Sequence, residues 1–323
     1  MDTKLAKGLI SEIAALNLTQ KITFHVMGEP TLHPDFFEIL AHASAENVPV
    51  GLTTNAGGLG GTVGKRLLDF KLQQIDFSLQ TPDENSFVLR KARKLTFDQY
   101  VKGILDFFSS YKAIWDDTVI KFRFLNTRFR PKDIEKKAGP IHVMSNNKEL
   151  REVFSSWTEK IYDILNMDQQ AKNTALKKIN KLVSYKWNVV EILPNVFFET
   201  YLLADWGHAF NDSKIHDAWA GYCFGMRDHF SILHNGDVTL CCIDFNGKTQ
   251  IGNAHYASLK DILSSKELEM IMKGFKKFRL VHPYCKQCLG SKSLLSWLTK
   301  PFAAIGGLYI LKPYFYKKVR LFS

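Results

Sequence analysis

The sequence predicts an α/β protein in which a parallel sheet with crossover helices is followed by a smaller α+β region. Three observations predict this fold class. Short apolar strands alternate with helical segments over residues 1–130, which is typical of βαβ units. Beyond residue 215 the predicted segments become shorter and richer in turn residues. All five cysteines lie at or after Cys223, which gives the last third of the chain a chemistry of its own.

The first 130 residues divide into helices and strands that follow one another in turn. Leu9, Ile10 and Ile13 recur at helical spacing and predict an amphipathic helix over 5–16. Short apolar runs bounded by turn residues predict buried strands over 22–26, 48–53, 74–79 and 119–125. Helices are expected between these strands, over 34–43, 65–70 and 97–109. We therefore expect each unit to add one parallel strand to a single sheet.

The regular alternation stops near residue 130. The lysine-rich stretch that follows predicts helices over 150–165 and 169–182, and a further strand is expected over 189–193. Short strands over 230–233 and 238–242 flank Asn235-Gly236, which is a hairpin signal, and a helix is expected over 259–278. The predicted domains are a barrel-like sheet (1–130), a helical insertion (131–185), the last sheet strand with a connector (186–215), a cysteine domain (216–290) and a basic amphipathic tail (291–323).

The composition is that of a globular protein. The chain has 323 residues, of which 46% are hydrophobic and 23% charged, and this length allows two domains. Residues 1–17 contain charged side chains and no apolar run of the kind a secretory signal needs. The longest apolar run near the end, 302–311, is shorter than the roughly 20 residues that span a bilayer. We therefore expect a cytoplasmic protein, and in a reducing compartment clustered cysteines bind metal more often than they form disulfides.

The net charge of +11 resides in the last part of the chain. No acidic residue follows Glu269, whereas Lys and Arg continue to the end. A basic segment that also contains Trp297, Leu298 and Phe302 suits an anionic surface, so we expect peripheral binding to the inner face of a membrane. A solvated basic end is the alternative. The sequence contains no recognised nucleic-acid motif, and no nucleic acid is expected as a partner.

Four cysteines have the spacing of a chelating set. Cys285 and Cys288 form a C-x-x-C pair, which we expect at a loop end where two thiolates reach one metal across a tight turn. Cys223 and Cys241, expected at strand ends, would complete the set. Four thiolates suit either tetrahedral zinc or an iron–sulfur cluster, and the spacing does not choose between them. Cys242 is expected to be spare, because it faces the other side of its strand.

A cysteine after Tyr222, a Gly-x-x-x-x-Cys from Gly236 to Cys241, a Gly-Asn at Gly252 and the closing cysteine pair follow one another in this order. This run, roughly 222–290, resembles the SPASM or twitch domain of radical S-adenosylmethionine (SAM) enzymes. The resemblance implies an auxiliary [4Fe-4S] cluster held by Cys223, Cys241, Cys285 and Cys288. Only four good ligands are present, which matches the short, single-cluster form better than the full SPASM pattern.

Polar or glycine-containing motifs follow the first strands, and these are Gly28-Glu29-Pro30, Asn55 with the glycines after it, and Ser78, with Arg90 farther along. They resemble the cofactor-binding positions of the radical SAM partial (β/α) barrel. The resemblance implies that Gly28, Glu29 and Pro30 receive the methionyl amine of SAM. It also implies that Asn55 and Ser78 lie beside the cofactor, Ser78 on its ribose side, and that Arg90 meets its carboxylate. These positions sit at or after the carboxyl ends of parallel strands, where α/β sheets bind ligands.

The resemblance has one large gap. Family members begin with a strand and a C-x-x-x-C-x-x-C motif, which binds the cluster that reductively cleaves SAM, and here no cysteine precedes Cys223. The sequence thus resembles a partial barrel that lacks its first strand. A truncated sequence, half of a split gene, or a scaffold that has lost catalysis would each account for this. Truncation is favoured, because the other cofactor positions are retained.

The resemblance implies an oxidoreductase-type radical SAM/SPASM enzyme. A 5′-deoxyadenosyl radical would abstract hydrogen from the substrate, and the auxiliary cluster would accept an electron or bind substrate. The chain alone is expected to be inactive, with no catalytic residue assigned, since a second [4Fe-4S] cluster would require the absent motif. Expected partners are a small-molecule, glycan or peptide substrate and a reducing electron donor. The alternative function is that of a non-catalytic metal- or cluster-binding scaffold protein.

Overall fold

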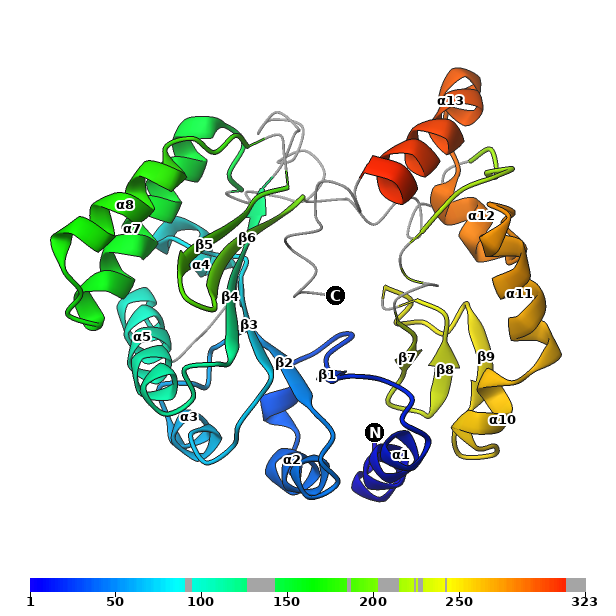
Figure 1. Cartoon of the computed structure of the whole chain (residues 1–323), viewed down its shortest axis with the longest axis horizontal. Helices are drawn as coiled ribbons and strands as arrows, with labels where there is room; N and C mark the ends of the chain where they lie inside the picture. The colour runs from blue at the N-terminus through cyan, green and yellow to red at the C-terminus, as the bar shows by residue number, and fades with distance from the viewer. Residues whose placement is uncertain are drawn as a thin grey trace. The chain divides into compact units, whose positions relative to one another are not determined.

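The computed structural model describes residues 1–90, 95–126, 143–184, 187–202, 215–223, 225, 229–241 and 243–311. The chain forms two compact units, whose elements are labelled in Figure 1. One unit combines Met1–Leu18 with Trp206–Ser323, and the other comprises Thr19–Asp205. The first helix is therefore grouped with the cysteine-containing end of the chain rather than with the sheet. The domain boundaries given above stay predictions.

The Thr19–Asp205 unit is built on a six-stranded sheet with the order β1-β2-β3-β4-β6-β5. The first five strands in this order are parallel neighbours, and β5 pairs antiparallel with β6 at the edge. This arrangement confirms the predicted α/β fold with a parallel sheet. The strands are β1 (Ile22–Phe24), β2 (Val50–Thr54), β3 (Gln74–Leu79), β4 (Val119–Asn126), β5 (Val189–Leu193) and β6 (Val196–Leu202).

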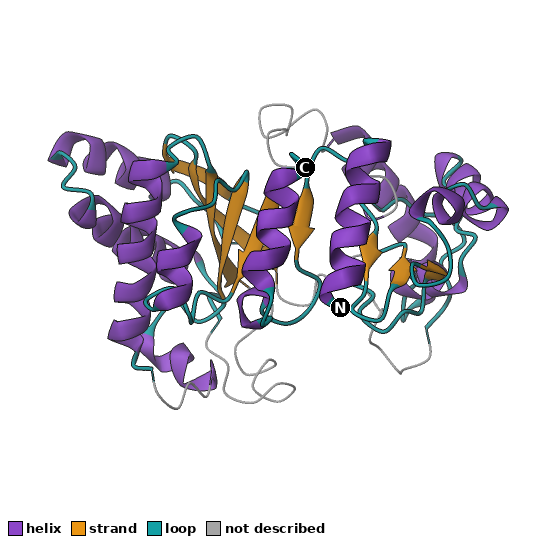
Figure 2. Ribbon diagram, turned by 90° about the horizontal axis from the view of Figure 1, so that it is seen from below, coloured by secondary structure: helices purple, strands orange, loops and turns teal. Residues whose placement is uncertain are grey.

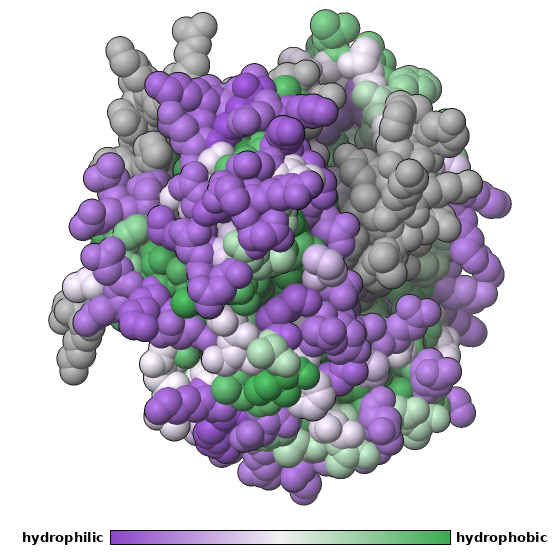
Figure 3. Space-filling view, turned by 60° about the vertical axis from the view of Figure 1, so that its left-hand side comes forward, coloured by the Kyte–Doolittle hydropathy of each residue, from purple (hydrophilic) through white to green (hydrophobic). Residues whose placement is uncertain are grey.

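Helices cover one face of this sheet, as Figures 1 and 2 show. Several begin at side-chain caps that the sequence provides, such as Thr96 before α5, Asn146 before α7 and Asp168 before α8. The surface on the side of these helices is largely hydrophilic (Figure 3), as expected for amphipathic helices. The helical elements are η1 (Pro30–Leu32), α2 (Phe36–Ala45), α3 (Thr62–Leu67), α4 (Glu84–Phe87), η2 (Val88–Arg90), α5 (Phe97–Ile114), α7 (Asn147–Ile164) and α8 (Gln169–Ile179).

Aromatic side chains fill the space between the sheet and its helices. The Phe122 ring of β4 lies 5.5 Å from Phe108 of α5 and 5.9 Å from Trp157 of α7. Phe124 lies 4.8 Å from Phe154, also on α7. Since successive strand residues point to opposite faces, the alternate residues of β4 lie on the face away from these helices. Two of those alternate residues, Lys121 and Arg123, are charged, and they belong to the site described below.

The end of the sheet differs from the prediction. The strand predicted over 189–193 is β5, which forms the antiparallel edge, and the parallel neighbour of β4 is β6. The sequence analysis did not predict β6. A turn at Asn195 joins the two strands, and its φ of 62° lies in the left-handed region that Asn tolerates. The pair is therefore a hairpin in which only the second strand continues the parallel order.

The unit that combines Met1–Leu18 with Trp206–Ser323 contains a small antiparallel sheet of β7 (Ser231–Ile232), β8 (Asp237–Thr239) and β9 (Gln250–Asn253). The predicted hairpin at Asn235-Gly236 is confirmed, and Gly236 has a φ of 84°, a value that favours glycine. The strand β9 was not predicted.

The single helix predicted over 259–278 is wrong, because two helices occupy this stretch. They are α10 (Leu259–Leu263) and α11 (Lys266–Lys276). The chain breaks between them because the Ser265 hydroxyl accepts a hydrogen bond from the Leu268 amide at 3.3 Å and caps a new helix.

The remaining elements of this unit are α1 (Thr3–Leu16), α12 (Pro283–Leu289), α13 (Leu294–Ala304) and η3 (Ile305–Leu311), which is a π-helix. The first helix joins the end of the chain through α10, where the Lys260 amide donates to Glu12 Oε1 at 3.1 Å. In the described part of the chain, no helix is both long enough and apolar enough to cross a membrane.

Candidate functional site

The turn after β1 places the Glu29 carboxylate against the end of β2. The chain reverses here through two residues with positive φ, Val26 at 123° and Gly28 at 94°. Glu29 Oε1 accepts from the hydroxyls of Thr31 and Thr54, both at 2.7 Å. Glu29 Oε2 accepts from the Asn55 amide at 2.5 Å. The carboxylate thereby ties η1, which starts at Pro30, to the carboxyl end of β2.

Arg90 joins the ends of β2 and β3. Its Nη1 donates to the carbonyl oxygen of Asn55 at 3.1 Å, and its Nη2 donates to the carbonyl oxygen of Ser78 at 2.9 Å. Its Nε donates to the Thr81 hydroxyl. The Tyr100 hydroxyl donates to the same Asn55 carbonyl at 3.0 Å, and the guanidinium carbon lies 4.9 Å from the Tyr100 ring centroid. Burial raises the pKa of Tyr100 to about 12, so its hydroxyl remains a donor at neutral pH.

The structure therefore brings Glu29, Asn55, Ser78 and Arg90 together along one edge of the sheet. Asn55 is the centre of this network, because its backbone N–H donates to Glu29 and its backbone carbonyl accepts from Arg90. The edge is the carboxyl end of the parallel strands, where the sequence placed them. The chain of contacts shows a bracing role for Arg90 that the sequence analysis did not foresee.

A buried charged cluster lies on the sheet face away from α5 and α7. Arg123 of β4 lies between two acids, with Nη2 3.0 Å from Asp76 Oδ2 and Nε 3.4 Å from Glu199 Oε2. Lys121 Nζ lies 3.9 Å from the same Glu199 oxygen. The side chains of Asp76, Lys121 and Glu199 are only 2% to 4% exposed. Burial lowers the pKa of Lys121, and the charges of Glu199 and Asp76 oppose this shift.

Arg123 is the partly exposed member of the charged cluster, with 21% of its side chain accessible. It is also the register partner of Ser78, so the cluster adjoins the candidate cofactor residues. Its guanidinium carbon lies 5.1 Å from the ring of Tyr201, which is also partly exposed. This cluster was not predicted from the sequence. The signal that could have found it is a charged residue at every second position of strands that are otherwise apolar, as at Lys121 and Arg123.

The unit that contains β7, β8 and β9 also contains four half-buried cysteines: Cys223, Cys241, Cys285 and Cys288. A Cβ atom on Gly225 would lie 3.5 Å from Cys241 Sγ and 3.6 Å from Cys223 Sγ, so both sulfurs flank one glycine. The Gly225 amide lies 3.4 Å from Cys223 Sγ and donates to it. The expected loop position of the C-x-x-C pair is wrong, because Cys285 and Cys288 lie on α12, three residues apart along a helix. A spacing of three brings both side chains to one helix face.

The four thiols affect one another electrostatically. Burial, together with the charges of the nearby Cys223, Cys288 and Cys241, raises the pKa of Cys285 to about 12. Without a cation, such a group stays protonated, because several thiolates in one half-buried place repel each other. Among the described residues, no group of three or more His, Cys, Asp or Glu side chains has the arrangement to hold a metal ion. Cys242, the predicted spare, lies outside the described residues.

Asp244 supports the loop that follows Cys241. Its carboxylate is almost fully buried and accepts from the Lys248 amide at 3.0 Å and the Thr249 amide at 2.5 Å. Its own amide donates to the Cys241 carbonyl at 3.1 Å. The sequence analysis assigned no role to Asp244.

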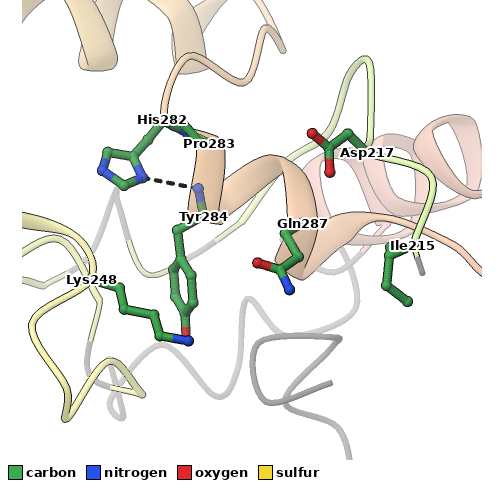
Figure 4. Close-up of a pocket in the computed structure, with 7 residues that line it drawn as sticks. All are labelled: Ile215, Asp217, Lys248, His282, Pro283, Tyr284 and Gln287. Atoms are coloured by element: carbon green, nitrogen blue, oxygen red, sulfur yellow. Dashed lines mark hydrogen bonds between the residues drawn. The ribbon is translucent and has the colours of Figure 1, made fainter. Parts of the chain in front are cut away.

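An open cavity of about 520 Å³ adjoins α12 (Figure 4). In Figure 4 the Tyr284 and Gln287 side chains extend from this helix, and the Tyr284 amide donates to His282 Nδ1 at 3.2 Å. Lys248 Nζ lies 5.3 Å from the Tyr284 ring centroid. The cavity is lined by Ile215, Asp217, Lys248, His282, Pro283, Tyr284 and Gln287. The cysteine pair and this mixed polar cavity therefore share one short helix.

Comparison with protein families assigns both regions. Residues 5–121 match the radical SAM superfamily, and residues 223–289 match the iron–sulfur cluster-binding domain named SPASM. The chain thus contains a radical SAM domain and a SPASM domain. The two matches confirm the resemblance that its motifs indicate. A comparison with curated proteins gives no match.

Several solved structures are similar to this radical SAM protein. SuiB of Streptococcus suis bound to S-adenosylmethionine has 17% identity and a TM-score of 0.45, over 85% of this chain and 61% of SuiB. BtrN in complex with AdoMet and 2-DOIA has 14% identity and a TM-score of 0.43, over 86% of this chain and 75% of BtrN. The protein anSMEcpe with bound AdoMet has 16% identity and a TM-score of 0.44, over 96% and 86%. The chain thus spans less than two thirds of the length of SuiB.

The two domains of this radical SAM protein imply SAM and iron–sulfur clusters as cofactors. The residue types present fit these groups, whereas the described side chains are not arranged as a single-ion site. Cysteine thiolates are the ligands that iron–sulfur clusters use, and the four half-buried cysteines are close enough for three of them to shift the pKa of Cys285. At the sheet edge, an acid, a backbone turn with glycine and an arginine offer the charges that match the amine and carboxylate of an amino acid.

Proposed function

We propose that this protein acts in an oxidoreductase-type radical SAM reaction, with SAM at the carboxyl edge of the sheet and an auxiliary iron–sulfur cluster on four cysteines. The observation that carries this proposal is the network in which Glu29, Asn55 and Arg90 join the ends of three neighbouring strands. A network at a sheet edge holds a ligand's polar groups in fixed positions. When bound and reduced, the cofactors supply a radical that removes a hydrogen atom from the substrate.

The residues at the edge have distinct roles in this proposal. Glu29 accepts the methionyl amine of SAM through the lone-pair capacity that remains on Oε2, to which the Asn55 amide already donates. Arg90 holds Asn55 and Ser78 in place and directs its remaining N–H groups to the carboxylate of SAM. Gly28 and Pro30 shape the turn, and Ser78 lies at the ribose.

The charged cluster forms the substrate-facing part of the same edge. Arg123 and Tyr201 are its exposed members, and Arg123 is at the register of Ser78. Asp76 and Glu199 fix the guanidinium from behind. We propose that Arg123 and Tyr201 orient a polar group of the substrate, whether small molecule, glycan or peptide. A reducing electron donor would reduce the clusters.

The cluster assignment is tested by metal analysis. We expect anaerobically reconstituted wild-type protein to contain iron and acid-labile sulfide, and Cys285→Ser to lose most of both. Cys242→Ser is the matched control, because it removes a neighbouring thiol that the proposal leaves unused, and it should retain wild-type iron. A colourless protein that binds zinc alone would contradict the iron–sulfur assignment.

The SAM assignment is tested by direct binding, which does not require catalysis. Equilibrium dialysis with labelled SAM should show weaker binding by Glu29→Gln and Arg90→Lys, by about tenfold each, because each loses a charge-assisted contact. The exposed Lys65→Gln variant on α3 is the control and should bind as wild type. Equal binding by all four proteins would contradict this placement of the cofactor.

A second candidate function is that of a non-catalytic, cluster-binding scaffold. It is favoured by the lack of any cysteine before Cys223, because this sequence then has no thiolate triad near the SAM site. On both candidates, the chain alone should release no 5′-deoxyadenosine from SAM under reducing conditions. Release of 5′-deoxyadenosine by the purified chain would overturn that expectation and the scaffold function with it.

A further inference from the structure

The helix α13 presents apolar side chains to solvent. Leu294, Leu298 and Phe302 are spaced by four residues and so form a stripe along one helix face, with Leu295 beside it. Their exposed fractions, with those of Tyr309 and Ile310 in η3, lie between 51% and 74%. Scattered exposed apolar residues are normal, but a continuous stripe of large ones marks an interaction surface.

The opposite face of α13 is fixed to its own unit. Trp297 Nε1 donates to the Asp217 carbonyl at 2.7 Å, and Trp219 Nε1 donates to the Trp297 carbonyl at 3.2 Å. Lys300 Nζ donates to the Gly290 carbonyl at 2.8 Å. The helix is therefore oriented by directed hydrogen bonds, and the outward position of its leucines is a consequence of that orientation.

The following helix, η3, is held to its unit by packing of an aromatic ring. The Tyr309 ring lies 5.1 Å from Phe278 and 5.2 Å from Tyr222. Tyr309 nevertheless exposes half of its surface, and its neighbour Ile310 exposes more. The apolar surface thus extends beyond α13 into η3.

The charges in this part of the sequence indicate the partner. The sequence has no acidic residue after Glu269, and from Met270 to the end its ionisable side chains, apart from cysteine and tyrosine, are basic. A sequence that combines apolar side chains with lysines, and has no carboxylate after Glu269, matches the boundary between the acyl chains and headgroups of an anionic bilayer. A protein surface of mixed charge would not need such a one-sided set.

We propose that the outer face of α13 and η3 binds the surface of an anionic membrane. The leucines and Phe302 insert at the level of the headgroups, and the exposed Lys292, which directly precedes the Ser293 cap of α13, contacts the phosphates of the lipids. The protein lies on the membrane through this face. The inference is independent of the proposed cofactor chemistry, because it uses residues outside both cofactor sites.

The test is co-sedimentation of the full chain with vesicles of phosphatidylcholine containing about 30% phosphatidylserine, compared with phosphatidylcholine alone. We expect wild-type protein to bind the anionic vesicles, and added salt to weaken the binding. Leu294→Ser combined with Leu298→Ser should reduce the bound fraction at least about tenfold. Met270→Ser on α11 is the matched control, because Met270 is also largely exposed and apolar but lies on another helix.

Each further outcome decides the proposal. Because Leu294 and Leu298 are exposed, the double variant should keep the wild-type circular dichroism spectrum and melting temperature. Wild-type protein that binds neither vesicle would overturn the proposal, as would a double variant that binds like wild type. If wild-type protein instead self-associates in solution and the double variant is monomeric, the face belongs to a second copy of the chain and the membrane proposal is wrong.

Discussion

Replacing Glu199 by Gln tests the buried charged cluster most directly. In the wild type, three cations (Lys21, Lys121 and Arg123) lie with two carboxylates (Asp76 and Glu199) on one face of the sheet. The substitution keeps the size of the side chain and removes one negative charge. Three cations then share the single carboxylate of Asp76.

The magnitude follows from burial and distance. Lys121 is 2% exposed, and its Nζ lies 3.9 Å from Glu199 Oε2. Arg123 keeps its 3.0 Å contact with Asp76, so Lys121 loses the most. Removing one partner of a buried ion pair costs about 3–5 kcal/mol, because the other charge stays buried. For a unit of this size, this loss corresponds to a decrease in melting temperature of about 10 °C.

The pH dependence separates this cause from a simple packing defect. Burial already lowers the pKa of Lys121 in the folded protein, whereas the unfolded chain titrates near about 10.4. Between these two values the unfolded chain binds more protons, so the free energy of unfolding rises with pH. Removing Glu199 lowers the folded pKa further and widens this window. The destabilisation of Glu199→Gln should therefore shrink as pH rises from about 7 to 10.

The assay is urea unfolding followed by circular dichroism at several pH values. Glu191→Gln on the edge strand β5 is the matched control, because Glu191 is exposed, and it should change stability by less than about 0.5 kcal/mol. Combining Glu199→Gln with Lys121→Met should restore much of the loss, since the uncompensated charge is then gone. A loss below about 1 kcal/mol, or one that is independent of pH, would refute this explanation of the cluster.

Three further predictions concern individual contacts. Tyr111→Phe should lower the free energy of unfolding in urea by about 2 kcal/mol, because the Tyr111 hydroxyl accepts from the Leu72 amide and donates to the Phe70 carbonyl. Tyr100→Phe should lower it by about 1 kcal/mol, because Arg90 also donates to the Asn55 carbonyl that Tyr100 contacts. The reverse ranking would contradict this. Asp244→Asn should cost about 2 kcal/mol and reduce iron content after reconstitution, since its oxygens accept from two amides behind Cys241; unchanged stability would show that the loop does not depend on Asp244. Gly252→Ala should destabilise the β9 region by about 1–3 kcal/mol, because an added Cβ would lie 2.8 Å from an Ile262 side-chain atom, and a wild-type melting temperature would refute the overpacking.

The parts of the fold that the sequence predicted are those with a strong local signal. Short runs rich in Val, Ile, Leu, Thr and Phe located β2, β3 and β4 to within about two residues at each end, because such runs are typical of strands. The break at Ser265 was missed because a serine cap competes with helix continuation by only about 1 kcal/mol, which a periodic pattern hides. The antiparallel pairing of β5 with β6 was not predicted, because the neighbour of a strand is set by contacts across the sheet and not by the local sequence.

The candidate site shows the same division. Glu29, Asn55 and Ser78 could be proposed because each belongs to a short motif at or next to a strand end, and Arg90 because of the family resemblance. Their mutual contacts could not, since Arg90 bonds to a residue 35 positions earlier. The charged cluster escaped for a related reason. Its members come from different strands, and only the register of the sheet shows that Arg123 and Glu199 are neighbours.

The two faces of α13 have separate roles, which makes the membrane proposal compatible with the cysteine site. The inner face bonds through Lys300 to Gly290, which follows Cys288 by two residues, so this face supports the end of the cysteine helix. The outer face contributes no hydrogen bond to that support, because its side chains are hydrocarbons without a donor or acceptor. Substitutions on the outer face should therefore change vesicle binding and leave iron content unchanged, whereas loss of the Lys300 ammonium should act on the cysteine site first. A common loss of both properties in the Leu294→Ser and Leu298→Ser variant would mean that α13 is a structural cover for the cysteine site.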